Sequence, residues 1–439
     1  MRELGVWMNG ELVATWSVDR NTHRLRYEPA WAASDRARSL SLSLPLAAGQ
    51  IAGERVHHFF RNLLPDNEQI RARLQRRFRT RAGDAIDLLE AIGRDCVGAV
   101  QLLPAGHAPA GWDAVRAEAL SEQDIVDLLD AVPTENSPRD LADDDLFRIS
   151  IAGAQEKTAL LQWQGKWCRP QGVTPTTHIV KLPLGLIGGS RRVDASDSVA
   201  NEWLCAQIVG ALGLPVARTE MHRFGGREVL VVQRFDRAWM DRGRWIARLP
   251  QEDFCQALGE PPERKYEQHG GPGMDRCLRM LRGSQDRDDE RYFALAQLAF
   301  FLLAATDGHA KNFSVFLDRG DAYRMTPLYD ILSMWPYLGD AGHQFSARKA
   351  GLAMALRSKS KHYLLHTIQA RHWQQLAQVS GGPTVWQAMI DLAASADAAL
   401  RQVEATLPPD FPGRTWETIS RGVRAQAERF LKDAAAVGR

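Results

Sequence analysis

An apolar run of about 14 residues, Tyr292 to Ala305, is followed almost at once by a polar segment that begins at Asp307. The run is shorter than the roughly 20 residues that a membrane-spanning helix needs, so it predicts a buried helix of a globular domain. Because the polar segment comes directly after that helix, we expect Asp307, His309 and Asn312 to lie at the edge of a core. Charged and amide side chains in such a place call for a chemical explanation.

The length of the chain bounds the number of domains. At 439 residues it is too long for one ordinary core, and we expect two or three. The net charge of +2 is nearly balanced, so the overall charge does not predict nucleic-acid binding. The five cysteines are scattered without a CxxC pair, which disfavours a disulfide framework or a zinc site. The first residues lack a signal-peptide core, so we expect a cytoplasmic protein without a membrane segment.

The pattern of residue types along the sequence predicts three regions. We expect a small N-terminal α/β subdomain over residues 1–104, opened by a hairpin at Asn9-Gly10. A linker rich in Pro, Ala and Gly ends it near residue 111. A β-rich nucleotide-binding lobe over 112–237 and a mainly helical catalytic lobe over 238–439 complete the α+β architecture.

Hydrophobic periodicity predicts the individual elements. The expected strands cover residues 6–8, 12–16, 23–27, 97–103, 147–151, 157–162, 166–169, 178–182 and 227–233, and the expected helices 66–79, 84–92, 121–131 and 198–212.

Asp307, Asn312 and Asp330 form the minimal polar set for magnesium-dependent phosphoryl transfer. The first Asp would orient the attacking hydroxyl and accept its proton, and the Asn and second Asp would hold metal ions. Asp330 follows apolar Leu328 and precedes apolar Ile331, the context of a metal-binding Asp on a hairpin. Taken alone, an Asp–x4–Asn segment more often closes a loop or caps a helix.

The β-rich region supplies candidate phosphate-binding groups. Small residues in the segment from Ser150 to Lys157 would let backbone N–H groups approach phosphate oxygens. Lys181 ends an Ile-Val-Lys strand, as a nucleotide-binding lysine does in kinases, and Glu202 in the next helix would pair with it. A plain turn, a strand-end lysine and a solvated Glu are the alternatives.

Two further features stay open. The segment from Gln233 to Arg237, which includes Phe235, lies where a hinge that meets adenine belongs, or it is a strand exit carrying surface charge. His309 lacks a second His or Cys at metal-binding spacing, so we expect it to form a hydrogen bond in its loop or to contact a phosphate. Basic runs at 71–81 and 357–362 are either phosphate or partner contacts or solvated faces.

Together these residues resemble the HipA family, the kinase toxins of bacterial HipBA toxin–antitoxin modules. The resemblance covers nearly the whole chain. Its motifs are Ser39-Leu-Ser-Leu-Ser-Leu-Pro45, Asn62-Leu-Leu-Pro-Asp66, Ile92-Gly-Arg-Asp-Cys-Val-Gly-Ala-Val100, Phe147-Arg-Ile-Ser-Ile-Ala-Gly-Ala-Gln-Glu-Lys157, Pro175-Thr-Thr-His-Ile-Val-Lys-Leu-Pro183, Arg234-Phe-Asp-Arg237, Leu249-Pro-Gln-Glu-Asp253, Gly270-Gly-Pro-Gly273 and Ala305-Thr-Asp-Gly-His-Ala-Lys-Asn-Phe-Ser314.

The resemblance implies a bilobal protein-kinase-like fold related to lipid kinases, with an additional N-terminal subdomain. It implies a serine/threonine kinase that uses ATP and Mg²⁺, phosphorylates glutamyl-tRNA synthetase, and so stops translation and produces dormant, drug-tolerant cells. It also implies a partner, a HipB-like helix-turn-helix antitoxin, and contact with operator DNA through that complex.

Residue roles carried over from the family complete this expectation. Asp307 would be the catalytic residue, Asn312 and Asp330 the metal ligands, and Ser150 an autophosphorylation site that expels its loop and switches the kinase off. Gln233 stands where the type member has Glu. The nucleotide-binding residues implied are Ala152, Gly153, Ala154, Gln155, Glu156, Lys157, Lys181, Gln233, Phe235, His309, Lys311, Asn312 and Asp330.

Two other functions compete with a protein kinase. Asp307, His309 and Asn312 also spell the D-x-H-x-x-N loop of aminoglycoside-phosphotransferase-type small-molecule kinases, although the N-terminal region and the Ser150 segment do not belong to that architecture. A non-catalytic co-repressor acting through HipB and DNA is the other, and it is compatible with kinase activity.

Overall fold

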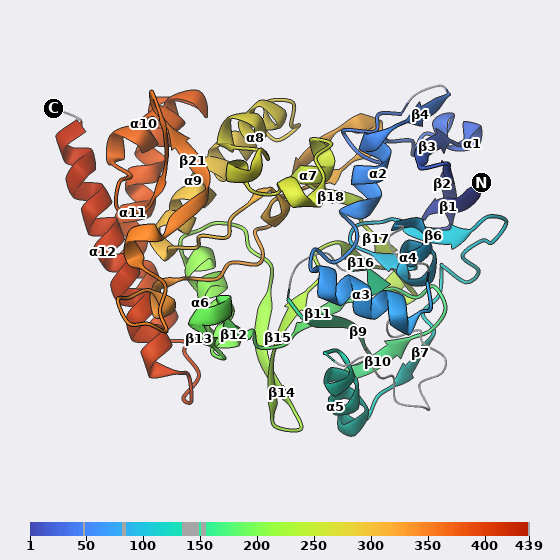
Figure 1. Cartoon of the computed structure of the whole chain (residues 1–439), viewed down its shortest axis with the longest axis horizontal. Helices are drawn as coiled ribbons and strands as arrows, with labels where there is room; N and C mark the ends of the chain where they lie inside the picture. The colour runs from blue at the N-terminus through green and yellow to red at the C-terminus, as the bar shows by residue number, and fades with distance from the viewer. Residues whose placement is uncertain (47–48, 81–84, 134–148, 151–154, 438–439) are drawn as a thin grey trace. The chain divides into compact units, whose positions relative to one another are not determined.

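The computed structural model describes residues 1–46, 49–80, 85–133, 149–150 and 155–437 (Figure 1). The chain divides into two compact units. Unit 1 consists of Met1–Leu182, His222–Glu263 and Ser314–Tyr323, and unit 2 of Pro183–Met221, Arg264–Phe313 and Arg324–Arg439. The boundaries expected near residues 104–112 and 237–238 stay predictions.

The first sheet of unit 1 is antiparallel, with strand order β4-β3-β2-β1-β6. Asn9 (φ 47°) and Gly10 (φ 86°) form the hairpin turn between β1 and β2, as predicted. The Trp16 and Phe60 rings stack with centroids 3.8 Å apart in the core beneath this sheet. The elements here are β1 (Arg2–Met8), β2 (Glu11–Asp19), β3 (Thr22–Tyr27), β4 (Gln50–Ala52), β6 (Gln101–Pro104), α1 (Pro29–Ala32), α2 (Glu54–Arg61), α3 (Glu68–Arg77) and α4 (Ala85–Ile92).

A second, six-stranded sheet has the order β14-β15-β11-β9-β10-β7. Helix α5 packs its Ile125 and Leu128 on Leu160, Val180 and Val231 of this sheet, and Ser121 caps the helix with a capping box to Asp124. The elements are β7 (Ala117–Ala119), α5 (Glu122–Ala131), β9 (Lys157–Trp163), β10 (Lys166–Pro170), β11 (His178–Lys181), β14 (Thr219–Phe224) and β15 (Arg227–Gln233).

Short elements complete unit 1. Strand β5 (Asp95–Cys96) pairs in parallel with β8 (Ile149–Ser150), which lies within the strand expected over 147–151. The remaining elements are β16 (Arg237–Met240), β17 (Trp245–Arg248), β18 (Gln251–Asp253), α7 (Phe254–Ala257) and β19 (Ser314–Leu317).

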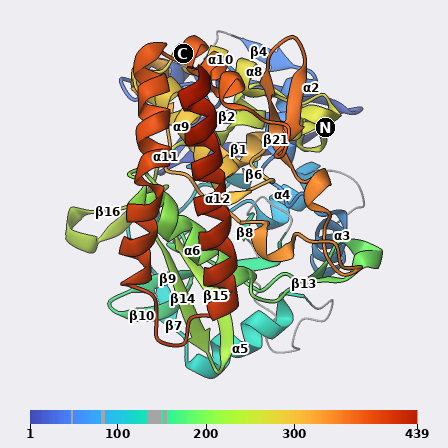
Figure 2. The ribbon, with the colours of Figure 1, turned by 90° about the vertical axis from the view of Figure 1, so that its left-hand side faces the viewer.

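Unit 2 is built mainly from helices. The predicted buried helix is α9 (Asp289–Leu303), and α11 (Pro383–Glu404) and α12 (Gly413–Val437) run alongside each other (Figures 1 and 2). Asp197 lies at the N-terminus of α6 (Ser198–Ala211), but its carboxylate accepts hydrogen bonds from Tyr337 and Thr415 instead of capping the helix. The other elements are α8 (Met274–Leu281), α10 (Ala370–Val379), β12 (Gly185–Ile187), β13 (Val193–Ala195) and β20 (Tyr323–Met325), which spans the passage from unit 1 to unit 2.

A hairpin interrupts the mainly helical C-terminal region. Strands β21 (Gly351–Arg357) and β22 (Lys361–Leu364) form it, and the basic run 357–362 lies across its turn. Arg357 (3.2 Å) and Lys361 (2.9 Å) both form ion pairs with the carboxylate of Glu267, whose side chain is only 3% exposed. These two cations therefore neutralise a buried acid of the same unit.

The segment 233–237 is not a strand exit carrying surface charge. Arg234, Asp236 and the side chain of Arg237 are buried with Asp95 and Arg248 in unit 1. Asp95 forms ion pairs with all three arginines, at 3.2 Å (Arg234), 2.9 Å (Arg237) and 3.2 Å (Arg248). Burial raises the pKa of Asp95, but the arginines lower it by more, so the carboxyl stays ionised. Residues from distant parts of the chain thus share one buried charge network.

Glu252 is a buried acid in a different state. Its Oε1 accepts a hydrogen bond from the Leu42 amide at 2.7 Å, while Oε2 is buried without a hydrogen-bond partner among the described residues. Burial raises the pKa of this carboxyl to about 8. Because the folded pKa lies above the unfolded value, the contribution of Glu252 to stability is fully present below about pH 4.5 and is lost as the pH rises through about 8.

We therefore expect Glu252→Gln to remove part of the pH dependence of unfolding. Wild-type stability should lose up to roughly 1.4 kcal/mol per pH unit from this group between the two pKa values. Urea unfolding of both proteins at a series of pH values measures the difference, which should grow with pH. Parallel curves for the two proteins would contradict the assignment.

No helix in the described part of the chain is both long and apolar enough to cross a membrane.

Candidate active site

The catalytic-loop residues predicted from the sequence all lie in unit 2, directly after α9. The helix ends at Ala304 in a left-handed conformation (φ 49°), which turns the chain into the polar segment. Gly308 then passes over the Phe300 ring, where an added Cβ would come within 2.3 Å of a ring carbon. Phe313, at the far end of the segment, packs on Phe293 and Phe300. The loop is therefore fixed by the aromatic core of the helix before it.

Within this loop the residues differ sharply in exposure. His309, Lys311 and Asn312 are buried, whereas the Asp307 side chain is 65% exposed. His309 Nε2 lies 4.0 Å from Asp307 Oδ2. The Asp307 carboxylate is therefore accessible, while the loop that carries it is fixed. A group that accepts a proton from a substrate must be accessible in this way.

Asn312 and Asp330 come together as predicted. Asn312 Nδ2 lies 3.4 Å from Asp330 Oδ2 and 3.4 Å from the Asp330 carbonyl oxygen. Asn312 Oδ1 is buried and has no hydrogen-bond partner among the described residues. An unsatisfied buried amide oxygen is costly, and a hard cation is a partner that would satisfy it. The pair therefore fits a magnesium site.

The expectation that Asp330 lies on a hairpin is wrong. Leu328 forms an isolated bridge with Val216, and Asp330 follows in irregular chain with a left-handed backbone (φ 59°). A non-glycine residue in this conformation is strained and persists where the surroundings impose it. The Tyr329 hydroxyl, which donates to the Lys311 carbonyl at 2.9 Å, ties this segment to the catalytic loop.

The remaining residues of the predicted nucleotide-binding set belong to unit 1. Lys181 ends β11, as predicted, and is buried, and Lys157 is its partner in the register with β9. The side-chain amide of Gln155 donates a hydrogen bond to the Leu182 carbonyl at 2.6 Å, and the Leu182 backbone N–H donates to the Glu156 carbonyl. The end of the Ser150–Lys157 segment is thus anchored beside Lys181. The predicted residues Ala152, Gly153 and Ala154 lie outside the described residues, and Ser150 is described by its backbone alone.

Arg73 gives the basic run of α3 a structural role. Its guanidinium holds both carboxylate oxygens of Glu156 at 2.6 Å, and its side chain is 14% exposed. Arg71 donates to the Pro65 and Asp66 carbonyls. The run is therefore not simply a solvated face, although Arg81 falls outside the described residues.

The two hinge candidates have different surroundings. Gln233 is exposed at the end of β15, where it pairs with His178 of β11. Phe235 is half-buried and packs edge-on against Phe316 at 5.9 Å. Lys181 and Glu202 are each buried, in β11 and α6, and their pairing stays a prediction.

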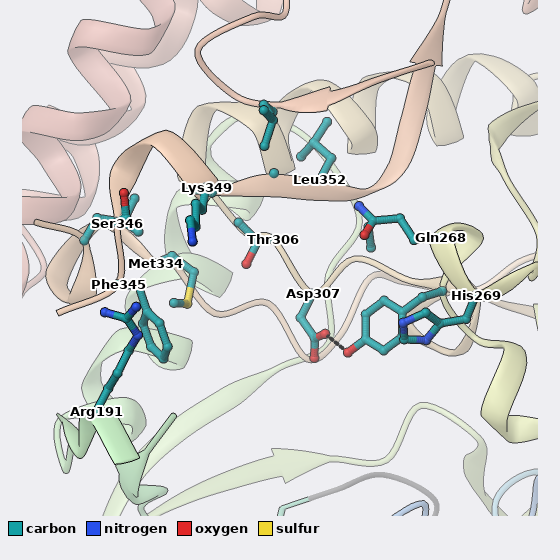
Figure 3. A pocket seen from close by; sticks show the side chains of 16 residues that line it. Arg191, Gln268, His269, Thr306, Asp307, Met334, Phe345, Ser346, Lys349 and Leu352 are labelled. Atoms are coloured by element: carbon teal, nitrogen blue, oxygen red, sulfur yellow. Dashed lines mark hydrogen bonds between the residues drawn. The ribbon is translucent and has the colours of Figure 1, made fainter. Parts of the chain in front are cut away.

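A cavity of about 460 Å³ opens beside Asp307 in unit 2 (Figure 3). Thr306 and Asp307 lie on one side, and Lys349 and Leu352 come from the segment that leads into β21 and from β21 itself. The Tyr266 hydroxyl donates a hydrogen bond to Asp307 Oδ1, a contact that no motif predicted. The only sequence signal for it is the position of Tyr266 shortly before Gly270-Gly-Pro-Gly273.

Comparisons with known proteins show which proteins this chain is similar to. Family models match residues 4–103 as "HipA N-terminal domain" and residues 149–408 as "HipA-like C-terminal domain". The protein Y4mE of Sinorhizobium fredii, whose name places it among kinases, is 34% identical over 92% of this chain and 93% of its own. The serine/threonine-protein kinase toxin HipA of Shewanella oneidensis is 27% identical over 76% of this chain and 75% of its own.

One solved structure has the same fold over the full length. It is the Shewanella oneidensis MR-1 complex of HipA, HipB and operator DNA, with a TM-score of 0.81 and 23% identity over 99% of both chains.

Proposed function

The chain belongs to the HipA family of kinases, and we propose that it is a toxin serine/threonine-protein kinase that transfers phosphate from ATP to a protein. The observation that carries the proposal lies in unit 2: an exposed Asp307 shares a tightly packed loop with Asn312, whose side chain meets Asp330. A proton acceptor and an adjacent metal site are the two requirements of magnesium-dependent phosphoryl transfer.

The chemistry assigns a role to each of these side chains. Asp307 accepts the proton of the acceptor hydroxyl as its oxygen attacks the γ-phosphorus. The bond from that phosphorus to the β–γ bridging oxygen breaks, and ADP leaves. Asn312 Oδ1 and the Asp330 carboxylate would hold Mg²⁺, which supplies positive charge to the phosphate oxygens.

Nucleotide binding is proposed for the residues implied by the family. Lys181 would neutralise phosphate charge, and the segment 152–157 would cover the phosphates. Gln233 and Phe235 would meet adenine, and His309 and Lys311 would support the phosphate end. The buried position of Lys181 and the anchoring of Gln155 to Leu182 support the first two roles.

The substrate, partner and regulation are proposed from the family as well. We assign glutamyl-tRNA synthetase as the protein substrate, with arrested translation and dormancy as the result, in the cytoplasm. A HipB-like antitoxin would bind the chain and bring it to operator DNA. The solved complex of HipA, HipB and operator DNA supports this proposal. Autophosphorylation of Ser150 would switch the kinase off, because a group of about −2 charge cannot share a site with ATP phosphates.

Labelling tests the proposed activity and its target together. We expect the purified protein, incubated with bacterial lysate, Mg²⁺ and γ-labelled ATP, to label a protein of the lysate on serine or threonine, and chelation of Mg²⁺ to abolish the label. Mass spectrometry should identify glutamyl-tRNA synthetase, and on the kinase itself Ser150. Label confined to small molecules would instead support the small-molecule kinase. Label on a different protein would overturn the assigned substrate, and a self-phosphorylated site other than Ser150 would overturn the assigned switch.

A further inference from the structure

Tyr266 contacts the proposed catalytic carboxylate directly. Its hydroxyl donates a hydrogen bond to Asp307 Oδ1, drawn as the dashed line in Figure 3. Because the Asp307 side chain is 65% exposed, packing does little to restrict its rotation. A hydrogen bond from a fixed donor therefore restricts the directions in which the carboxylate points.

Both the ring of Tyr266 and the backbone next to it contact the catalytic loop. Its ring meets the buried His309 ring edge-on, with centroids 4.8 Å apart. The preceding carbonyl, of Lys265, accepts a hydrogen bond from the Ala310 amide of the catalytic loop at 3.2 Å. The donor and the carboxylate are thus parts of one connected local structure.

The chain after Tyr266 adds a second anchor. Glu267 is buried and accepts hydrogen bonds or ion pairs from the Ala355 amide (2.7 Å), Arg357 (3.2 Å) and Lys361 (2.9 Å). The Gly271 amide donates back to the Tyr266 carbonyl at 3.0 Å, and a Cβ on Gly271 would lie 1.7 Å from the Arg264 carbonyl oxygen. Only glycine fits there, so the Gly270–Gly273 motif serves to fold this segment tightly behind Tyr266.

We propose that Tyr266 is a positioning residue that orients Asp307 toward the acceptor hydroxyl. The inference rests on the proposed kinase function and deepens it. Tyr266 keeps its proton throughout and touches neither nucleotide nor acceptor in this role. With Oδ1 held, rotation of the carboxylate is restricted, and the hydroxyl that enters from the adjoining cavity more often meets an aligned oxygen.

The test is the Tyr266→Phe variant, which deletes the donor and keeps the ring. We expect kcat for protein phosphorylation to fall by about tenfold, because a carboxylate that is free to rotate is less often aligned. The KM values for ATP and for the protein substrate should stay within about twofold of wild type, because neither molecule loses a contact.

Tyr337→Phe is the matched control. Tyr337 also donates its hydroxyl to a carboxylate of unit 2, Asp197 Oδ1 at 2.8 Å. It is buried, so its loss should lower the unfolding temperature while kcat stays at the wild-type value. An equal fall in kcat for both variants would overturn the proposal, because it would mean that the effect comes from lost stability.

A double variant separates a role through Asp307 from any other. In an Asp307→Asn background, adding Tyr266→Phe should lower the residual rate no further if Tyr266 acts only through that side chain. A further fall of about tenfold, or an unchanged kcat in the single variant, would overturn the inference. Failure of the kinase function would look different, because wild-type protein would then transfer no phosphate.

Discussion

Asp307→Asn is expected to lower the rate of phosphoryl transfer by about 10²–10⁴-fold, the usual contribution of a positioned general base. The amide keeps an oxygen that can accept the Tyr266 hydrogen bond, but it cannot take the proton of an attacking hydroxyl. Because the native side chain is largely exposed, the substitution should cost little folding stability. Expression of the variant in a bacterium without the antitoxin should therefore no longer arrest growth.

Two measurements make this result specific. Thermal unfolding should show a folded variant, and its affinity for Mg-ATP should match that of wild type, because Asp307 is not assigned to the nucleotide or the metal. A variant that still arrests growth, at equal expression, would refute the catalytic role of Asp307.

Asp95→Asn is expected to destabilise unit 1 by about 3–5 kcal/mol, the cost of breaking a buried ion network by removing one partner. The substitution leaves three buried guanidinium groups, of Arg234, Arg237 and Arg248, with one carboxylate fewer among them. The Thr176 hydroxyl, which donates to Asp95 at 2.7 Å, loses its charged acceptor. Urea-induced unfolding followed by tryptophan fluorescence measures the loss.

An exposed pair in the same unit provides the control. Asp113 binds Arg244 at 3.1 Å with side chains 48% and 65% exposed, so Asp113→Asn should cost less than about 1 kcal/mol. The wild-type network should also weaken in acid. Because the folded pKa of Asp95 is depressed, its contribution is present above the unfolded pKa and is lost as the pH falls toward the folded value. Equal costs for the two variants would contradict this account of the network.

What could be predicted from the sequence was local. The tight turn of a hairpin needs two left-handed residues in a row, and Asn9-Gly10 adopts this conformation readily. The dipeptide therefore identifies the hairpin without knowledge of the rest of the chain. The helix α9 follows from one apolar run, and the Asp307 segment from its position directly after it. The position of Lys181 at the end of its strand follows from two apolar residues, Ile179 and Val180, that precede the lysine.

What could not be predicted depends on contacts across long separations. Tyr266 meets Asp307 across 41 residues, and Arg234 meets Asp95 across 139. The run Arg234-Phe-Asp-Arg237 has the composition of a surface turn. Its burial depends on Asp95, a carboxylate from a remote segment that forms ion pairs with both arginines. Asp330 lies beside Asn312, as the motif spacing predicts, but its local structure does not follow from the motif, because Leu328 bridges to the remote Val216.

The approach of Gly308 to the Phe300 ring has a genetic consequence. Since the loop that carries Asp307 rests on a side chain of the α9 core, substitutions that reshape the core beneath it displace the loop even where the protein still folds. A selection for bacteria that survive expression of this chain should therefore recover escape mutations at Phe300, Gly308 and Phe313 as well as at Asp307. Their products would be soluble, abundant and harmless, and would map a buried surface that no substrate touches.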